Sequence, residues 1–206
     1  MKRCFVIANG ESRKEFDINK LWPYGTIIGI NAVYRDKPKL DYLVGVDIKM
    51  MNEIGDSGYT DAEIWTYPRS QIKYDHFKRF KEDKGWSSGP TAVLLAIQKE
   101  FDEIFIVGMD FSGVLREGKS KLRHNNMYKG TPNYREASRE ATFSGNWENQ
   151  MKRNCQSSPK TKFIRVCQKD VEQFRVVPKK LRDVENLSQI FYEDLEVLMG
   201  AWTKIR

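Results

Sequence analysis

Short runs of apolar residues recur along the chain, and turn-forming or charged residues bound each run. The runs lie at residues 4–8, 26–30, 42–46, 62–66, 104–107 and 163–167. Their hydrophobicity is continuous rather than alternating, which is typical of strands that are covered on both faces. The pattern therefore predicts an α/β fold in which a Rossmann-like, mostly parallel sheet is flanked by helices.

Two helices are expected beside these strands. Residues 91–101 are apolar around most of a helix circumference, Pro90 suits a first turn, and Ser88 or Gly89 can cap the helix. Ser87, Ser88 and Gly89 would then lie at its positive end. Apolar residues at spacings of three, four and seven predict a second, amphipathic helix over about residues 181–202, which would cover a face of the sheet.

Residues 112–161 differ from the rest because they contain several glycines and prolines and few periodic apolar positions. We expect a loop-rich lid or insertion there. The length of 206 residues, with 40% apolar and 31% charged positions, suits one α/β domain over residues 1–206. No apolar run approaches the roughly 18 to 20 residues that span a bilayer. We expect a cytoplasmic protein without a membrane span, and make no prediction of its oligomeric state.

Cysteine and histidine are too few for a structural metal or disulfide framework. Cys4, Cys155 and Cys167 are odd in number and widely spaced, and only His76 and His124 add further soft ligands. These numbers argue against both a disulfide scaffold and a four-ligand zinc site. The sequence predicts three reduced thiols.

Positive charge is regional. Residues 112–183 contain 17 Lys or Arg against 7 Asp or Glu, a net charge of +10, and the whole chain carries +7, which leaves −3 for the remainder. A basic region on a mildly acidic body fits a ligand that bears phosphate, or nucleic acid, although a solvated Lys/Arg face explains it equally well.

Polar residues follow nearly every predicted strand. In an open α/β sheet, ligands bind beyond the carboxyl ends of the strands. Turn and cap roles are the alternative for each of these residues taken singly. They are Asn9, Gly10 and Ser12 after the first strand, Asn31 after the second, Asp47 after the third, and Asp110 after the fifth.

Two common nucleotide-binding motifs are missing from the sequence. The loop Asn9–Ser12 has one glycine where the dinucleotide fingerprint needs three, and no P-loop motif occurs. A Rossmann dehydrogenase or a P-loop kinase is therefore disfavoured. A short Asn-Gly-x-Ser loop still allows close approach to a phosphate or a ribose, and Ser87–Gly89 offers a second such place.

Four segments resemble, in order, the bacterial CMP-sialic-acid sialyltransferases. They are Asn9-Gly10-Glu11-Ser12, Gly29-Ile30-Asn31 with Tyr34, Ser87-Ser88-Gly89, and Glu103-Ile104-Phe105-Ile106-Val107-Gly108-Met109-Asp110-Phe111. The same order is found in the archaeal 6-hydroxymethylpterin pyrophosphokinase-like proteins, which resemble the sialyltransferases in this nucleotide-binding half. The resemblance covers about residues 3–112 and, weakly, 162–168.

The resemblance implies a nucleotide site in which Asn9, Asn31, Ser87, Ser88 and Gly89 contact the ligand. Gly10, Ser12 and Asp110 lie in the same strand-end loops and are added to that predicted site. In those transferases the lid supplies a histidine base and tyrosine hydroxyls that steady the departing phosphate. The corresponding segment here, about residues 143–148, contains no histidine.

His124 is the candidate substitute base, because it lies in the predicted lid and an imidazole suits proton abstraction from a sugar hydroxyl. A solvent-facing loop histidine is the alternative interpretation. Tyr128 and Tyr134 are candidates for hydrogen bonding to phosphate, and Arg116, Lys119, Lys121 and Arg123 for neutralising it.

The sequence thus predicts nucleotide-dependent group transfer, most concretely a glycosyltransferase that uses a nucleotide-sugar donor and requires no cofactor. The alternative enzyme class is a phosphotransferase, pyrophosphokinase or phosphohydrolase that depends on Mg²⁺, with Asp47 and Asp110 holding the ion. A nucleotide-binding or nucleic-acid-binding protein without turnover is the third hypothesis.

Overall fold

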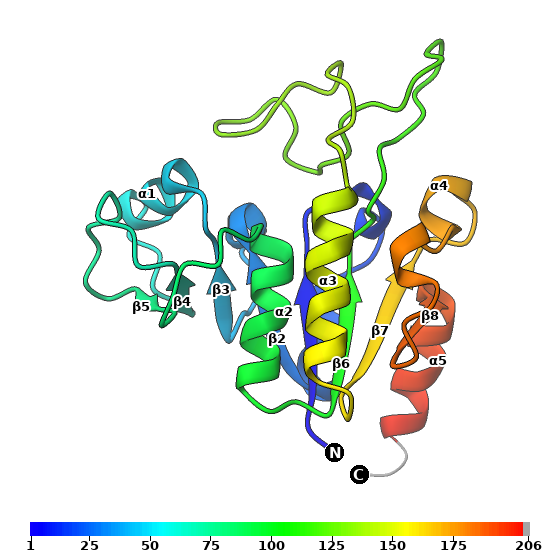
Figure 1. Cartoon of the computed structure of the whole chain (residues 1–206), viewed down its shortest axis with the longest axis horizontal. Coiled ribbons are helices and arrows are strands. Elements are labelled where there is room, and N and C mark those ends of the chain that lie inside the picture. Colours follow the sequence, from blue (N-terminus) through cyan, green and yellow to red (C-terminus); the bar gives the residue numbers. More distant parts are fainter. Residues whose placement is uncertain (204–206) are drawn as a thin grey trace.

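One eight-stranded parallel sheet forms the centre of the protein (Figure 1), in a computed structural model that describes residues 1–203. The strand order is β5-β4-β3-β2-β1-β6-β7-β8, and every neighbouring pair is parallel. This confirms the predicted Rossmann-like α/β fold. The strands are β1 (Arg3–Ile7), β2 (Thr26–Ile30), β3 (Tyr42–Val44), β4 (Glu63–Thr66), β5 (Lys78–Arg79), β6 (Glu103–Val107), β7 (Lys162–Cys167) and β8 (Leu187–Phe191).

Helices cover both faces of the sheet, which explains the continuous apolar runs. The helices are α1 (Ile48–Asp56), α2 (Ser88–Gln98), α3 (Gly145–Ser157), α4 (Glu172–Arg175) and α5 (Tyr192–Thr203), with short 3-10 segments at Glu11–Arg13, Ile18–Tyr24, Asn31–Asp36 and Lys179–Leu181. Cys4 and Val6 of β1 face an apolar cluster shared with α2 and α3, whereas Phe5 and Ile7 face a second cluster shared with α1 and α5. Figure 1 shows α2 and α3 side by side across one face.

The strand order reverses between β1 and β6. The chain builds the sheet outward from β1 to β5, returns to place β6 on the other side of β1, and then continues outward to β8. Cys4 is consequently in register with Thr26 of β2 and with Ile104 of β6. At such a reversal the loops that follow the two central strands diverge, which opens a crevice at their carboxyl ends.

The predicted C-terminal helix is wrong over its first half. Leu187–Phe191 form β8, which pairs with β7 in the register Phe163 to Leu187, and the helix α5 begins only at Tyr192. Apolar positions 187, 190 and 191 fit helical spacing, but the open edge of β7 offers a complete set of backbone hydrogen bonds to the same residues. Pairing at the sheet edge therefore overrides the helical pattern.

The lid is shorter than the sequence predicts. Its long irregular stretch covers residues 112–144, which extend beyond the carboxyl ends of the strands (Figure 1), and a short turn at residues 158–161 follows α3. Residues 145–157 form α3, which packs beside α2. Met151 and Cys155, four residues apart, place a narrow apolar stripe of α3 in the core. Seven of the 17 basic residues in the region 112–183 lie within residues 112–144, so most of the predicted lid charge belongs to other elements.

Two further observations concern expectations from composition. None of the helices within residues 1–203 combines the length and the apolar character that crossing a bilayer requires. Cys4, Cys155 and Cys167 are free thiols and buried. Desolvation raises the pKa of the Cys155 thiol to about 12, so this thiol is protonated and unreactive at neutral pH.

Candidate functional site

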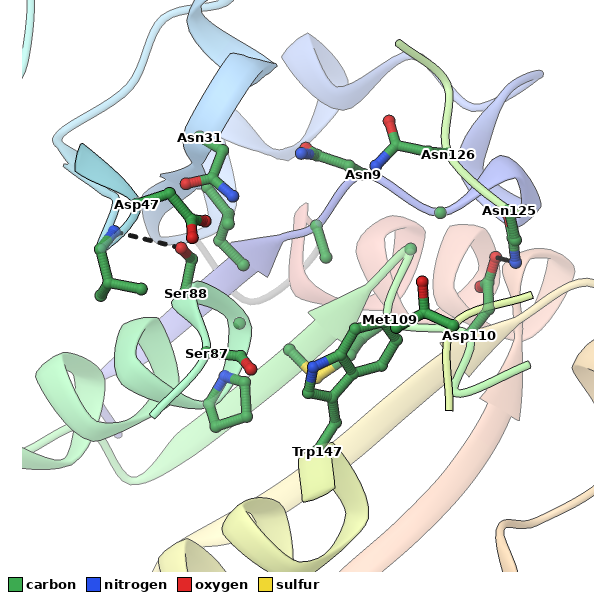
Figure 2. A pocket seen from close by; sticks show the side chains of 18 of the residues that line it. Asn9, Asn31, Asp47, Ser87, Ser88, Met109, Asp110, Asn125, Asn126 and Trp147 are labelled. Carbon is green, nitrogen blue, oxygen red and sulfur yellow. Dashed lines mark hydrogen bonds between the residues drawn. The ribbon is translucent and has the colours of Figure 1, made fainter. Parts of the chain in front are cut away.

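A cavity of about 560 Å³ lies at the point where the strand order reverses. The loops that follow β1, β2, β3 and β6 form its base, the first turn of α2 forms one wall, and the lid forms another. Figure 2 shows how these side chains surround it. The sequence-predicted residues that line the cavity are Asn9, Gly10, Asn31, Asp47, Ser87, Ser88, Gly89, Asp110, His124 and Tyr134.

Two asparagines in the cavity have hydrogen-bonding capacity that the protein does not use. Asn9 is 8% exposed, and its Nδ2 donates to the Tyr134 hydroxyl at 2.8 Å. The Oδ1 atoms of Asn9 and Asn31 are buried without a partner among residues 1–203. A buried carbonyl oxygen that lacks a hydrogen bond costs about 1 to 3 kcal/mol, so both atoms favour a ligand that supplies donors.

Asn31 sits at a tight turn between β2 and the 3-10 segment that follows. Its φ of +52° lies in the left-handed region, which asparagine tolerates better than most residues. The 3-10 segment thus begins directly at the end of β2. The amide is thereby kept at the cavity instead of being carried away along the following segment.

The first turn of α2 presents backbone donors to the cavity. Ser87 is the N-cap, its side chain makes no capping bond, and Pro90 has no N–H. Ser88 and Gly89 therefore begin the helix rather than capping it, which corrects the sequence-based assignment. Their N–H groups have no partner within the helix and lie at its positive end, where anions bind. The Ser88 hydroxyl is already engaged, because it accepts a hydrogen bond from the Val46 N–H at 3.2 Å.

Asp110 is a buried carboxylate that connects the loops around the cavity by hydrogen bonds. It is 6% exposed and accepts hydrogen bonds from the Ser12 N–H at 3.1 Å, the Ser12 hydroxyl and Asn125 Nδ2 at 2.8 Å. Desolvation raises the pKa of its carboxyl. Asn125 also accepts from the Glu11 N–H at 2.7 Å. The network joins the loops after β1 and β6 to the lid, so Ser12 and Asp110 help to shape the cavity. Ser12 was predicted to contact the ligand, but it does not line the cavity.

The arrangement does not bring Asp47 and Asp110 together. Figure 2 shows Asp47 on the side of the cavity that also carries Asn31 and Ser88, while Asp110 lies on the opposite side beside Asn125. Within the described residues 1–203, no three His, Cys, Asp or Glu side chains form a group suited to a metal ion. A divalent cation in this cavity could be coordinated by only one of the two aspartates, and phosphate oxygens and water would have to supply its other ligands.

His124 and Arg135 are two of the lid residues that line the cavity. His124 Nε2 is buried without a partner among the described residues. Desolvation, together with the charge of Arg135, lowers the pKa of the imidazole, so it is neutral and able to accept a proton at pH 7. Arg135 is exposed, and its guanidinium has neither an ion pair nor a hydrogen bond within residues 1–203.

Sequence reasoning missed Arg135, and only its position next to Tyr134 in the lid could have suggested it. The four cations that the sequence predicts do not line the cavity. Arg116 pairs with Glu11 at 2.7 Å, Lys121 with Glu140 at 3.4 Å, and Arg123 donates to the Ser138 carbonyl at 3.2 Å. Lys119 is exposed on the lid.

Tyr128 also lies away from the cavity. Its hydroxyl donates to Asp36 at 2.6 Å and accepts from Arg13 at 2.9 Å, and its ring belongs to the core on the α1 and α5 face. Tyr128 therefore fastens the lid to the body of the protein. Of the two predicted tyrosines, only Tyr134 reaches the cavity.

Two tryptophans that the sequence patterns did not single out line the cavity, Trp86 and Trp147. Trp147 comes from the first turn of α3 and packs against the apolar cluster that contains Met109 (Figure 2). Residues 143–148, which the resemblance matches to a histidine-bearing segment, thus reach the site and contribute an aromatic ring there. Spacing of four between Trp147, Met151 and Cys155 is the signal that could have found this helix.

Gly10 is needed because one backbone carbonyl and one carboxylate lie against its Cα. A Cβ there would lie closer than 3.0 Å to the Gly108 carbonyl oxygen and to Asp110 Oδ2. We expect Gly10→Ala to lower the free energy of unfolding by about 1 to 3 kcal/mol, as overpacking does elsewhere. Urea denaturation measures the change. Gly200→Ala is the control, because a Cβ at Gly200 meets nothing within 4 Å, and an unaltered midpoint for Gly10→Ala would contradict the prediction.

Comparisons of the chain with protein-family models, with curated proteins and with solved structures gave no match. The functional argument therefore depends on the chemistry of the cavity itself.

Proposed function

We propose that this cavity binds a nucleotide-sugar donor and that the protein transfers the glycosyl group to an acceptor hydroxyl. The observation that supports this is the convergence of unused hydrogen-bonding groups from separate elements in one cavity. They are the first N–H groups of α2, the buried amide oxygens of Asn9 and Asn31, and the imidazole of His124. Unused donors at a helix N-terminus suit phosphate, and unused acceptors suit hydroxyl and amino groups.

The arrangement of charge suggests how such a donor would lie. Its phosphate would sit between the first turn of α2 and Arg135. Within residues 1–203, these are the only two features of the cavity that offer positive charge without a carboxylate partner. Arg69, the other cation of the lining, forms an ion pair with Asp83 at 2.7 Å. The flat base would stack on Trp147. The sugar would then extend toward Asn31, which supplies hydrogen bonds to its hydroxyls.

The reaction requires one proton acceptor and stabilisation of one leaving group. The acceptor oxygen would form a bond to the anomeric carbon while the bond between that carbon and the phosphate oxygen breaks, and the electron pair would leave with the phosphate. His124 would accept the proton of the acceptor hydroxyl, since its imidazole is neutral. Arg135 and the N–H groups of α2 would stabilise the charge that develops on the phosphate.

Ligand-induced stabilisation tests the proposal directly. Thermal unfolding would be followed with CMP, UMP, GMP, AMP and their sugar conjugates, each with and without Mg²⁺. A ligand at 100 times its Kd adds about 2.7 kcal/mol to the stability of the folded protein. We expect one base to stabilise the protein without Mg²⁺. Stabilisation that depends wholly on Mg²⁺, with phosphoryl transfer products, would favour the phosphotransferase alternative, and no stabilisation by any nucleotide would reject the proposed site.

Arg135 provides a sharper test within the lid. We expect Arg135→Ala to weaken nucleotide monophosphate binding by about tenfold, because it removes one charged hydrogen bond to the phosphate. Isothermal titration calorimetry measures the change. Arg139→Ala is the matched control, since Arg139 is an exposed residue of the same segment that does not line the cavity. Equal weakening by both variants would show that general charge, rather than this contact, attracts the ligand.

A further inference from the structure

A second, smaller cavity of about 270 Å³ adjoins the first. The two share four lining residues, Asn31, Asp47, Asn133 and Tyr134. The rest of the smaller cavity is formed by Ile48, Lys49 and Met50, the first turn of α1. The shared residues form a junction between the cavities, so a molecule in the smaller one lies beside a molecule in the larger one.

We infer that the smaller cavity is the acceptor subsite, and that it binds a neutral, hydroxyl-rich acceptor such as a sugar through the carboxylate of Asp47. This inference rests on the proposed function, because it assigns the second substrate of the same reaction.

Asp47 is the residue on which the inference depends. It is exposed, and its carboxylate has no hydrogen bond or ion pair among the described residues. It occupies the N-cap position of α1, where an aspartate side chain usually accepts from the first turn, yet it makes no capping bond. Figure 2 shows the carboxylate turned toward the large cavity, on the side of Asn31. An uncapped helix with a free carboxylate at the junction leaves both oxygens available to a ligand.

The opposite wall of the smaller cavity is held firmly by ion pairs and hydrogen bonds. Arg35 forms an ion pair with Glu53 and donates to Thr131 Oγ1 at 2.7 Å and to the Pro132 carbonyl at 3.0 Å. Asn133 Nδ2 donates to Glu53 Oε2 at 2.6 Å. The lid segment is therefore fixed to α1 and to the 3-10 segment after β2. These bonds fix the wall of the smaller cavity that the lid segment forms.

The chemistry of the smaller cavity favours a neutral molecule with many hydroxyl groups. Asp47 supplies acceptor oxygens, whereas Lys49 supplies donors and has no ion pair within residues 1–203. Together the two charges give an anionic acceptor no net attraction, and its carboxylate would lie beside that of Asp47, so a neutral molecule is favoured. Hydroxyl groups serve as partners for both, and the partly buried side chain of Ile48 suits the C–H face of a sugar ring.

Binding of simple glycosides to the nucleotide-bound protein tests the inference, whatever the natural acceptor is. The probes are methyl α-glucoside, methyl β-galactoside and methyl α-mannoside, with methyl β-glucuronide as an anionic comparator, measured by saturation-transfer NMR in the presence of the stabilising nucleotide. We expect at least one neutral glycoside to bind at least ten times more tightly than the glucuronide. Asp47→Asn should weaken that binding about tenfold and reduce the discrimination against the glucuronide, because a charged acceptor is lost.

Asp61→Asn is the matched control, since Asp61 is an exposed aspartate outside both cavities. It should leave glycoside binding as in the wild type. Nucleotide affinity of Asp47→Asn is measured alongside, because a loss as large as the loss of glycoside binding would place Asp47 in the donor site and overturn the acceptor subsite. If no neutral glycoside binds the nucleotide-bound protein, or if Asp47→Asn binds it as the wild type does, the acceptor subsite is wrong. If no nucleotide binds at all, the proposed function fails first, and the inference fails with it.

Discussion

Replacing His124 by glutamine should slow glycosyl transfer by about 10² to 10⁴-fold, the usual contribution of a positioned general base. His124 Nε2 is buried at the cavity and has no protein partner among residues 1–203, so its proton-accepting position is not used by the protein. Glutamine keeps a polar group of similar size but cannot accept a proton. Initial rates with the nucleotide sugar that stabilises the protein most would measure the loss, and nucleotide affinity should change little.

If His124 is the general base, the rate of glycosyl transfer should fall at low pH. The neutral imidazole is the active form, so the rate should be constant at neutral pH and fall as the pH drops through the pKa of His124. Desolvation and the charge of Arg135 lower that pKa below its usual value of about 6.5, which places the acid limb below the usual range. Arg135→Ala should move the limb to higher pH. An acid limb that persists in the glutamine variant would assign the proton acceptor to another residue.

The sheet could be predicted from the sequence because strands that are buried on both faces consist of consecutive apolar residues. Continuous apolar runs located six of the eight strands, and polar residues after them located most of one side of the cavity. It missed β5, which has only two residues, and it assigned β8 to a helix. Both are edge strands, where half-exposed residues carry a weak pattern and where pairing is decided by the neighbouring strand.

The lid was harder to predict because its conformation depends on contacts distant in sequence. Arg135 reaches the cavity while Lys119, Lys121 and Arg123 do not, although all four are basic residues of one irregular segment. Their placement follows from the Asp110–Asn125 hydrogen bond and from Tyr128, whose hydroxyl is bound by Arg13 and Asp36. No local pattern encodes these bonds, so composition could indicate a basic lid but could not select which cations face the ligand.

Arg165 illustrates a signal that the sequence does contain, a charged residue inside the buried run Phe163-Ile164-Arg165-Val166-Cys167. The side chain is 2% exposed and donates to carbonyl oxygens at the end of β6 and in the α4 region, and to Gln189 Oε1 of β8. Its contacts at the end of β6 are the carbonyls of Met109 and Asp110, at 3.3 and 3.1 Å. Arg165 thus holds the loop that forms part of the cavity floor.

We expect Arg165→Met to lower the free energy of unfolding by about 3 to 5 kcal/mol, because it fills the volume but leaves several buried carbonyl oxygens without donors. Urea denaturation measures the loss, and Arg153→Met is the control, since Arg153 is exposed on α3 and has no partner among the described residues. Arg165→Lys should recover only part of the stability, because one ammonium cannot reach acceptors in the loop after β6, in the α4 region and on β8 together. A loss below about 1 kcal/mol for Arg165→Met would mean that water replaces the guanidinium readily, and that the floor of the cavity does not depend on this side chain.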